Sequence, residues 1–582
     1  MFRFSVVAFL MAVLCSPAVQ SSSVEPVEEI AGRYIDAWKT FYPSLAYSQG
    51  FLSSSTGVED FSTEAIQRWV AFNHEALNAL ESSSVELSHD SHIDARLLAR
   101  RIRSELEKWE QDRPHENDLG LYAAPIAECS RRVLDSDLLS PNEKTAALLR
   151  QFVQIEALCA AAPSTLTNGR PGATGRAMAE LEKAALFYEN ELPEAARRWI
   201  DGNELQSFIQ RSRQASSAVQ GLVDYLRENL LPHLTLLDEP ILGYEDYARK
   251  LMIYTDGDLT PEQLEAMALE EIRQAKKRIR EVASRYWDET YGDRDALLDP
   301  SEVVSRAFSD LEDDRPLGEQ EYLETLRKYA QGAEDFVREH DIVTLPPEKT
   351  LSIVLAPESS GPMARIGYVS VPPPFHPNPW TTWYLATIPD THPEQEREDF
   401  WRSFNYPFKK FIVIHELFPG HYLQLKMLRE NLHPVRILFL YDPFTEGWAT
   451  LCEKVALDEG YAEGQWLVQL AQLRKRLENA NRAYMSVQAH CNGWSEEDVY
   501  RFSIESSLLA PQFAKSLWGR LMDSPMQMIT YMIGYLELSR IYEAEKARLG
   551  DDFRTKDFMD TLIRTGPVPT SEFPAILERR RH

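Results

Sequence analysis

The stretch FIVIHELFPGHYLQ, residues 411–424, holds the most informative pattern in the chain. An apolar run ends in His415 and Glu416, a second histidine follows at His421, and Glu446 stands further on in the segment TEGWA. Hydrolytic zinc sites hold the ion through three side chains that offer histidine nitrogens or carboxylate oxygens, and they leave a fourth position for water. We therefore predict a metal site on a helix, with His415, His421 and Glu446 as ligands and Glu416 as the general base.

The spacing of the two histidines sets a condition on the backbone. In the common HExxH motif the histidines lie four positions apart, so that both face one side of a helix. A separation of six positions would place the second one about 120° around a regular helix and roughly 9 Å further along. Pro419 and Gly420 stand between His415 and His421, and an interior proline breaks helical hydrogen bonding. The metal site thus predicts a broken helix here, and the alternative is a buried helix with two hydrogen-bonded histidines and an ordinary Pro-Gly turn.

Further segments follow this stretch in an order that is known from one bacterial family. They are EGWA at 446–449 with Glu453 beyond it, HCNGWS at 490–495, PMQ at 525–527 leading to YMIG at 531–534, and a tail with LGDDF at 549–553 and GPVP at 566–569. Together with HELFPGHYLQ, they resemble the signatures of the bacterial DUF885 family of unknown function. That family is similar to the helical zinc oligopeptidases and carboxypeptidases of the gluzincin type, so the resemblance implies a helical fold and a zinc peptidase.

The chain departs from the family pattern at three places. Tyr422 stands where the family often has a second, successive histidine, which leaves His421 as the partner available to His415. The segment SVQAH at 486–490 replaces the family's DTGxH, and Met526 replaces a glycine. These changes bear on the substrate that the chain would prefer more than on its metal.

The resemblance also implies roles for residues outside the histidine motif. His490 and Tyr531 become candidates to donate hydrogen bonds to the oxyanion that forms when water attacks a carbonyl group. Without the resemblance, each would be an ordinary hydrogen-bonded structural residue. Glu453 lies seven residues after Glu446, near the same helical face, so it is either the third ligand or a side chain that orients a ligand. We favour Glu446 as the ligand.

These residues lead us to expect a zinc-dependent metallopeptidase that hydrolyses small or unfolded peptides through an activated water molecule. Histidine and carboxylate ligands also suit manganese and cobalt. Cleavage at the carboxyl end of a peptide would need a cation near the metal, for which Arg482 and Arg365 are the candidates. Two alternatives stay open: a zinc amidase acting on a non-peptide amide, and an exported helical binding protein without turnover. The presence of Glu416 favours an enzyme.

The amino terminus predicts export. A basic start at residues 1–3 precedes an apolar run from Phe4 to Leu14, which is too short for an ordinary transmembrane helix, and small residues follow. We predict a signal peptide at 1–18 and a periplasmic or secreted protein with no membrane span. Lipid attachment at Cys15 is less favoured, because the bulky Leu14 occupies a position where a lipobox has a small residue.

Charge and cysteine content narrow the class of partner and compartment. The formal net charge of −28 argues against binding to nucleic acid or to anionic lipid. Cys129, Cys159, Cys452 and Cys491 form no disulfide framework and no CxxC pair, although one or two bridges would suit an oxidising compartment. A peptide substrate is the expected partner, and the sequence does not define the oligomeric state.

Hydrophobic spacing predicts a mainly α-helical fold, and we expect one large body with two lobes and a deep cleft. Apolar residues recur at helical spacing in the first lobe, residues 19–257, as Ile30, Tyr34 and Trp38 show. The second lobe, residues 258–582, would contain the zinc site at 415–446.

The second lobe opens with a clear helix start. Thr260 occupies the cap position, Pro261 the first turn and Gln263 the capping-box position. We predict that the helix begun here runs toward Tyr286.

One segment, about 345–390, is predicted to form a small antiparallel sheet next to the helix of the metal site. Runs rich in β-branched and aromatic residues at 350–355, 366–371 and 383–388 are typical of strands. A stiff loop, PPPFHPNPW at 372–380, separates the last two. An exposed edge strand could pair with an extended peptide and hold it over the metal. A purely structural role in capping the helices is the equal alternative.

Overall fold

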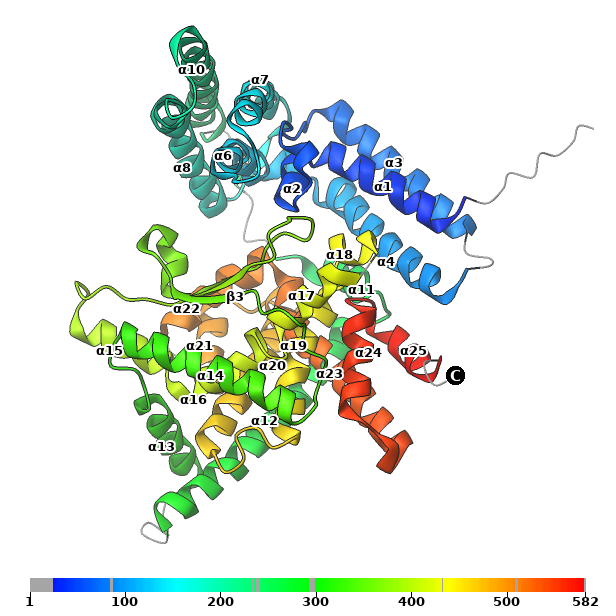
Figure 1. Ribbon diagram of the computed structural model, residues 1–582, viewed down its shortest axis with the longest axis vertical. Helices are drawn as coiled ribbons and strands as arrows, with labels where there is room; N and C mark the ends of the chain where they lie inside the picture. Colours follow the sequence, from blue (N-terminus) through cyan, green and yellow to red (C-terminus); the bar gives the residue numbers. More distant parts are fainter. Residues whose placement is uncertain are drawn as a thin grey trace, which may run out of the picture.

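The structure is a computed structural model that describes residues 25–83, 87–232, 235–236, 241–292, 299–431, 433–507 and 511–579. The signal peptide predicted at 1–18 lies outside these residues. Helices dominate the fold and form two lobes, one above the other in Figure 1, which confirms the mainly α-helical prediction. Within the described residues, no helix combines the length and the apolar composition that a membrane crossing requires.

The first lobe is an array of helices whose apolar faces meet. Ile30, Tyr34 and Trp38 lie on one face of α1 and are almost fully buried, as their spacing predicts. The helices of this lobe are α1 (Val27–Phe41), α2 (Pro43–Ser48), α3 (Thr63–Ser83), α4 (His89–Leu106), α5 (Pro114–Asn117), α6 (Gly120–Asp135), α7 (Pro141–Thr165), α8 (Pro171–Leu186), α9 (Leu192–Ala196) and α10 (Gly202–Tyr225). The short strands β1 (Asn168–Gly169) and β2 (Thr235–Leu236) pair in parallel.

The second lobe surrounds the long helix α20, which contacts α12, α16 and α23. The predicted capping box is present: Thr260 Oγ1 accepts a hydrogen bond from the backbone N–H of Gln263, whose side chain accepts one from the backbone of Thr260. The helices are α11 (Gly243–Thr255), α12 (Pro261–Thr290), α13 (Pro300–Asp313), α14 (Glu319–Glu339), α15 (Glu394–Ser403), α16 (Tyr406–Glu416), α17 (His421–Asn431), α18 (Pro434–Leu438), α19 (Asp442–Asp458), α20 (Trp466–Cys491), α21 (Glu496–Ser507), α22 (Pro511–Asp523), α23 (Pro525–Leu549), α24 (Thr555–Thr565) and α25 (Phe573–Arg579).

Helix α11 joins the two lobes. It contacts α4 of the first lobe as well as α12, α20 and α23 of the second. Its Arg249 forms a salt bridge of 2.8 Å with Glu107, and its Lys250 forms one of 2.6 Å with Asp112. The predicted boundary at residue 257 therefore follows a helix that both lobes share.

Two glycines allow α19 and α23 to touch backbone to backbone. A Cβ atom on Gly534 would lie 1.8 Å from the carbonyl oxygen of Pro443, and one on Gly447 would lie 2.5 Å from the carbonyl carbon of Gly534. Only glycine fits at such distances. Because Glu446 is the neighbour of Gly447 and Tyr531 lies three residues before Gly534, this contact brings two predicted site residues together.

The small sheet is mixed, with the strand order β3-β5-β4. Strand β4 (Tyr368–Ser370) pairs with β5 (Thr381–Leu385) in the predicted antiparallel sense, whereas β3 (Leu351–Leu355) pairs with β5 in parallel. The prediction of an antiparallel sheet is thus wrong for one of the two pairings. The reason is topological: the chain crosses from β3 to the far edge before β5 inserts between the two earlier strands.

The sheet lies against helix α17, as expected from its place in the sequence. The hydroxyl of Tyr422, on the first turn of α17, accepts a hydrogen bond from the backbone N–H of Thr350 at 2.9 Å. Lys426 donates to the Thr350 hydroxyl, and Arg327 of α14 donates to the carbonyl of Ile353 at 2.8 Å. The edge of β3 is therefore partly covered.

Candidate metal centre

The helix that carries His415 is broken where the sequence predicts. Helix α16 ends at Glu416, and α17 begins at His421. The turn between them is held by the side-chain N–H of Trp448, which donates to the Pro419 carbonyl at 3.0 Å. A Cβ atom on Gly420 would lie 1.7 Å from the backbone oxygen of His415. The break therefore requires glycine at this position, and it turns the chain back over the end of α16.

This turn places His421 beside His415 and opposite Glu446 of α19. Glu446 Oε2 lies 3.4 Å from Nε2 of His421 and 3.8 Å from Nε2 of His415. One ligand atom from each residue lies within 4.8 Å of the other two, and the imidazole rings are nearly perpendicular. The structure thus brings together the three residues that the sequence proposes as ligands.

The three side chains fit a zinc ion in number, chemistry and spacing. Ligands at about 2.1 Å from a tetrahedral zinc ion lie roughly 3.4 Å from one another, which is close to the observed separations. Glu446 Oε2 is buried and, although His421 Nε2 lies 3.4 Å away, it accepts no hydrogen bond of regular geometry within the described residues, whereas buried carboxylate oxygens are normally satisfied. A cation held between the oxygen and the two imidazole nitrogens would satisfy it.

A second carboxylate fixes the orientation of His415. Glu453 lies about two turns after Glu446 on α19. It accepts a hydrogen bond from Nδ1 of His415 at 2.8 Å and another from Gln472 at 3.1 Å. This leaves Nε2 of His415 free to face Glu446. Of the two roles that the sequence leaves open for Glu453, the geometry supports the orienting one.

His421 and Glu446 are electrostatically coupled. Burial opposes ionisation of Glu446, but the neighbouring His421 outweighs it and lowers the pKa of Glu446 to about 2. Burial likewise disfavours the charged form of His421, yet Glu446 raises the pKa of His421 to about 9. The site therefore favours a carboxylate with a cationic neighbour, which is the charge arrangement that a metal ion would also satisfy.

Tyr531 lies near Glu446 and Glu416, whereas His490 makes its hydrogen bonds elsewhere. Burial and then the charge of Glu446 raise the pKa of Tyr531, to which Glu416 also contributes. His490 is buried instead between backbone groups: its Nδ1 accepts from the N–H of Leu242 at 3.2 Å, and its Nε2 donates to the carbonyl of Leu521 at 3.0 Å. Both ring nitrogens are occupied, so we remove His490 from the candidate catalytic residues.

The two arginines proposed as carboxylate-binding cations lie in different places. Arg365 donates to the carbonyl of Thr387 at 3.0 Å and contacts His392 beside the small sheet. Arg482 of α20 lies over the ring of Tyr531. Lys475, one further cation near Glu446, belongs to no motif, and sequence reasoning missed it.

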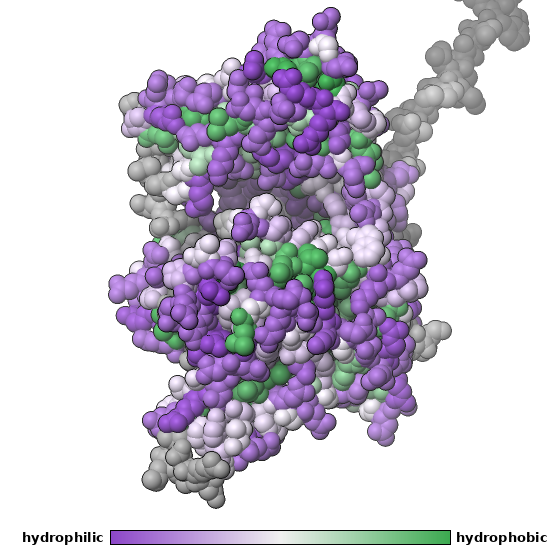
Figure 2. Space-filling view, turned by 60° about the vertical axis from the view of Figure 1, so that its left-hand side comes forward, coloured by the Kyte–Doolittle hydropathy of each residue, from purple (hydrophilic) through white to green (hydrophobic). Residues whose placement is uncertain are grey.

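A cleft separates the lobes, and the residues that line it do not include Glu446. Two hollows of about 490 and 700 Å³ lie between the lobes and share Asp112, Lys250 and Met526 as lining residues. The smaller one is also lined by Asp442, which lies one helical turn before Glu446 on α19. Figure 2 shows the surface hollowed between its upper and lower parts.

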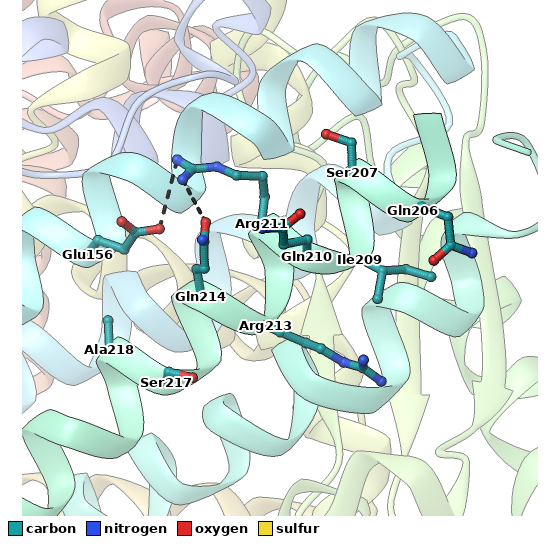
Figure 3. Close-up of a pocket in the computed structure, with 10 residues that line it drawn as sticks. All are labelled: Glu156, Gln206, Ser207, Ile209, Gln210, Arg211, Arg213, Gln214, Ser217 and Ala218. Carbon is teal, nitrogen blue, oxygen red and sulfur yellow. Dashed lines mark hydrogen bonds and ion pairs between the residues drawn. The ribbon is translucent and has the colours of Figure 1, made fainter. Parts of the chain in front are cut away.

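A separate hollow of about 920 Å³ lies on the first lobe, along α10 (Figure 3). Its lining is polar, and its Arg211 donates to Gln214 at 2.7 Å and lies 3.9 Å from Glu156. None of the predicted site residues lines it. Its charges are already paired within the protein, so we do not assign it to the metal centre.

One family profile and two solved structures match most of this chain. The profile of the family described as "Bacterial protein of unknown function (DUF885)" matches residues 43–576. A "putative lipoprotein of unknown function" from Shewanella oneidensis shares the fold with a TM-score of 0.82 and 21% identity, over 95% of this chain and 100% of that one. A second structure, described as a "putative lipoprotein" from Colwellia psychrerythraea, gives a TM-score of 0.72 and 17% identity, over 96% of this chain and 99% of that one. No curated protein matches.

Proposed function

The chain belongs to the DUF885 family, and we propose that it is a zinc-dependent peptidase that hydrolyses small or unfolded peptides. The observation that carries this proposal is the buried Oε2 atom of Glu446. It faces Nε2 of both His415 and His421 and accepts no hydrogen bond of regular geometry within the described residues. A carboxylate that could act as a base, Glu416, follows His415 directly in the chain.

Each residue would have a definite part in amide hydrolysis. Zinc, when bound, supplies an acidified water molecule and polarises the carbonyl group of the substrate. Glu416 would accept the proton of the attacking water and pass it to the departing amine. The phenol of Tyr531 would donate a hydrogen bond to the carbonyl oxygen as negative charge develops there. No covalent intermediate with the protein is needed.

The cleft supports a peptide as the substrate. Its two hollows, of about 490 and 700 Å³, share three lining residues, so together they would offer room for a peptide rather than for a folded protein. We propose export to the periplasm or the medium, which the predicted signal peptide and the lipoprotein description of the two relatives support. Lipid attachment at Cys15 is the second form of export to test.

Metal analysis followed by a peptide screen tests the proposal. We expect close to one zinc ion per chain after dialysis, and hydrolysis of members of a mixed peptide library. A chelator should abolish this hydrolysis, and zinc should restore it. Failure to bind zinc even when the ion is supplied would refute the metal centre and favour the alternative of a binding protein.

A further inference from the structure

Three cationic side chains gather around Tyr531 next to the metal centre. Lys475 and Arg482 lie on α20, and Arg520 lies on α22. The Lys475 ammonium and the Arg482 guanidinium each lie 5.8 Å from the centroid of the Tyr531 ring. Arg520 interacts with the same tyrosine and with Arg482. We call these three side chains the cation cluster.

The cation cluster holds more positive charge than its surroundings balance. Arg482 has one acidic neighbour, Glu478, at a distance of 3.7 Å, and both side chains are almost buried, with 11% and 12% exposed. The buried Nε of Arg482 has no hydrogen-bond partner among the described residues. Among the residues that the structure describes, neither Lys475 nor Arg520 has a carboxylate within salt-bridge distance. The buried Arg436, by contrast, forms a salt bridge of 2.5 Å with Asp94.

Burying positive charge without a paired anion raises the free energy of the folded protein, and a bound anion would lower it. Buried charges in proteins are normally paired and hydrogen-bonded. Among the described residues, Glu478 is the one carboxylate within salt-bridge distance of the three cations, and Glu453 and Glu446 act on Lys475 from further away, while the whole chain carries a formal net charge of −28. A local group of three cations in a strongly acidic protein is therefore a specific feature and not part of a general basic surface.

The cation cluster adjoins the reacting position. Burial lowers the pKa of Lys475, as does Arg482, while Glu453 and Glu446 oppose this effect. The electrostatic reach of Lys475 thus includes the metal centre. Tyr531 adjoins both regions, because the charges of Glu446 and Glu416 raise its pKa while those of Arg482 and Arg520 lower it.

We propose that Lys475, Arg482 and Arg520 bind the C-terminal carboxylate of a peptide, and that the protein removes residues from the carboxyl end of its substrates. This inference rests on the proposed peptidase function and specifies its substrate. Arginine guanidinium groups offer paired N–H donors that match a carboxylate. An acidic side chain offers the same chemistry, but the position of the cluster beside Tyr531 favours the end of the chain. A carboxylate held there would lie close to the bond under attack.

Binding without turnover tests the pocket directly. We would load the Glu416→Gln variant with zinc and measure its affinity by fluorescence anisotropy for three labelled peptides that differ only at the C-terminal end. One peptide has a free C-terminal acid, one is amidated, and one is amidated with a glutamate at the last position. We expect the free acid to bind tenfold or more tightly than the plain amide, because a charge-assisted hydrogen bond contributes about 1.5–3 kcal/mol.

Substitutions then assign the effect to the cation cluster. Introducing Arg482→Gln or Arg520→Gln into the same variant should reduce binding of the free acid to the level of the amide while zinc content is kept. Arg482→Lys should restore part of the preference. Arg474→Gln is the matched control, because Arg474 lies on the same helix but pairs with Glu312 at 3.0 Å, and it should leave the preference unchanged.

The outcomes separate this inference from the proposed function. Equal binding of acid and amide, including no binding of either, overturns the pocket. Tighter binding of the amidated glutamate peptide than of the free acid overturns the C-terminal assignment and points to acidic side chains. A preference for the free acid without any hydrolysis by the unsubstituted zinc protein would support the pocket and refute the peptidase.

Discussion

Nδ1 of His415 donates a hydrogen bond of 2.8 Å to Glu453, and both side chains are almost fully buried. The two residues lie 38 positions apart and on different helices. Because the carboxylate can only accept, the bond fixes the tautomer in which Nε2 carries the lone pair. This lone pair faces Glu446, where a metal ligand is required.

Replacing Glu453 should therefore weaken metal binding without removing a ligand. We expect Glu453→Gln to lower zinc affinity by about 10- to 100-fold, measured by competition with a chromogenic chelator. Asp458→Asn is a suitable control, since Asp458 lies on the same helix and pairs with Lys454 near the surface. Unchanged affinity in the Glu453 variant would show that the hydrogen bond does not orient a ligand.

The general base can be separated from the ligands by comparing two variants. Glu416→Gln should keep zinc and reduce the turnover number by about 10²-fold or more, because the amide cannot accept the proton of water. His415→Ala should lose both zinc and turnover. Elemental analysis and peptide hydrolysis rates measure the two properties separately. Full zinc occupancy in His415→Ala would contradict the assignment of this residue as a ligand.

The metal centre was partly predictable because its decisive signals are local. Pro419 and Gly420 interrupt the helix within the motif itself, and the short separation from His415 to His421 limits where the second ring can lie. Glu446 was predictable as a partner from its motif. The role of Glu453 was left open, because the choice between ligand and orienting group depends on the rotation of α19 relative to α16.

The remaining features depend on contacts between distant segments. The parallel pairing of β3 with β5 follows from the order in which three strands assemble, and strand patterns do not encode this order. Lys475 comes near Glu446 only because α20 packs against α16 and α23, which both contact α19. His490 belongs to a family motif, yet its two ring nitrogens form hydrogen bonds with the backbone of Leu242 and Leu521. Helical spacing predicts the elements of this fold, whereas these further contacts arise only when distant segments pack together.

Gly420 should be intolerant of any side chain. A Cβ atom would lie 1.7 Å from the backbone oxygen of His415, so Gly420→Ala must move the turn that carries His421. We expect a loss of roughly 3 kcal/mol in the free energy of unfolding and weaker zinc binding, measured by denaturant titration and metal analysis. Gly332→Ala is the control, because no atom lies within 4 Å of a Cβ at this site on α14, and alanine favours a helix. Equal effects of the two substitutions would contradict the tight turn.

Lys409 should make stability rise with pH. Burial lowers the pKa of this lysine from 10.5 to about 7, against the opposing charge of Glu416, and its ammonium lies over the ring of Phe404. Between pH 7 and 10.5 the unfolded chain therefore binds a proton that the folded chain has lost, so the free energy of unfolding increases across this range. Below pH 7 both states are charged, and the cost of burying the charge is fully present.

Lys409→Met removes this cost and isolates the contribution of the lysine. We expect the variant to be more stable than the parent by roughly 2–4 kcal/mol at pH 6.5, and the difference to shrink toward zero near pH 10.5, in urea titrations at each pH. Lys328→Met, on the exposed face of α14, is the control and should change stability by less than about 0.5 kcal/mol at either pH. A gain that is the same at both pH values would mean that packing of the methionine, and not the buried charge, accounts for it.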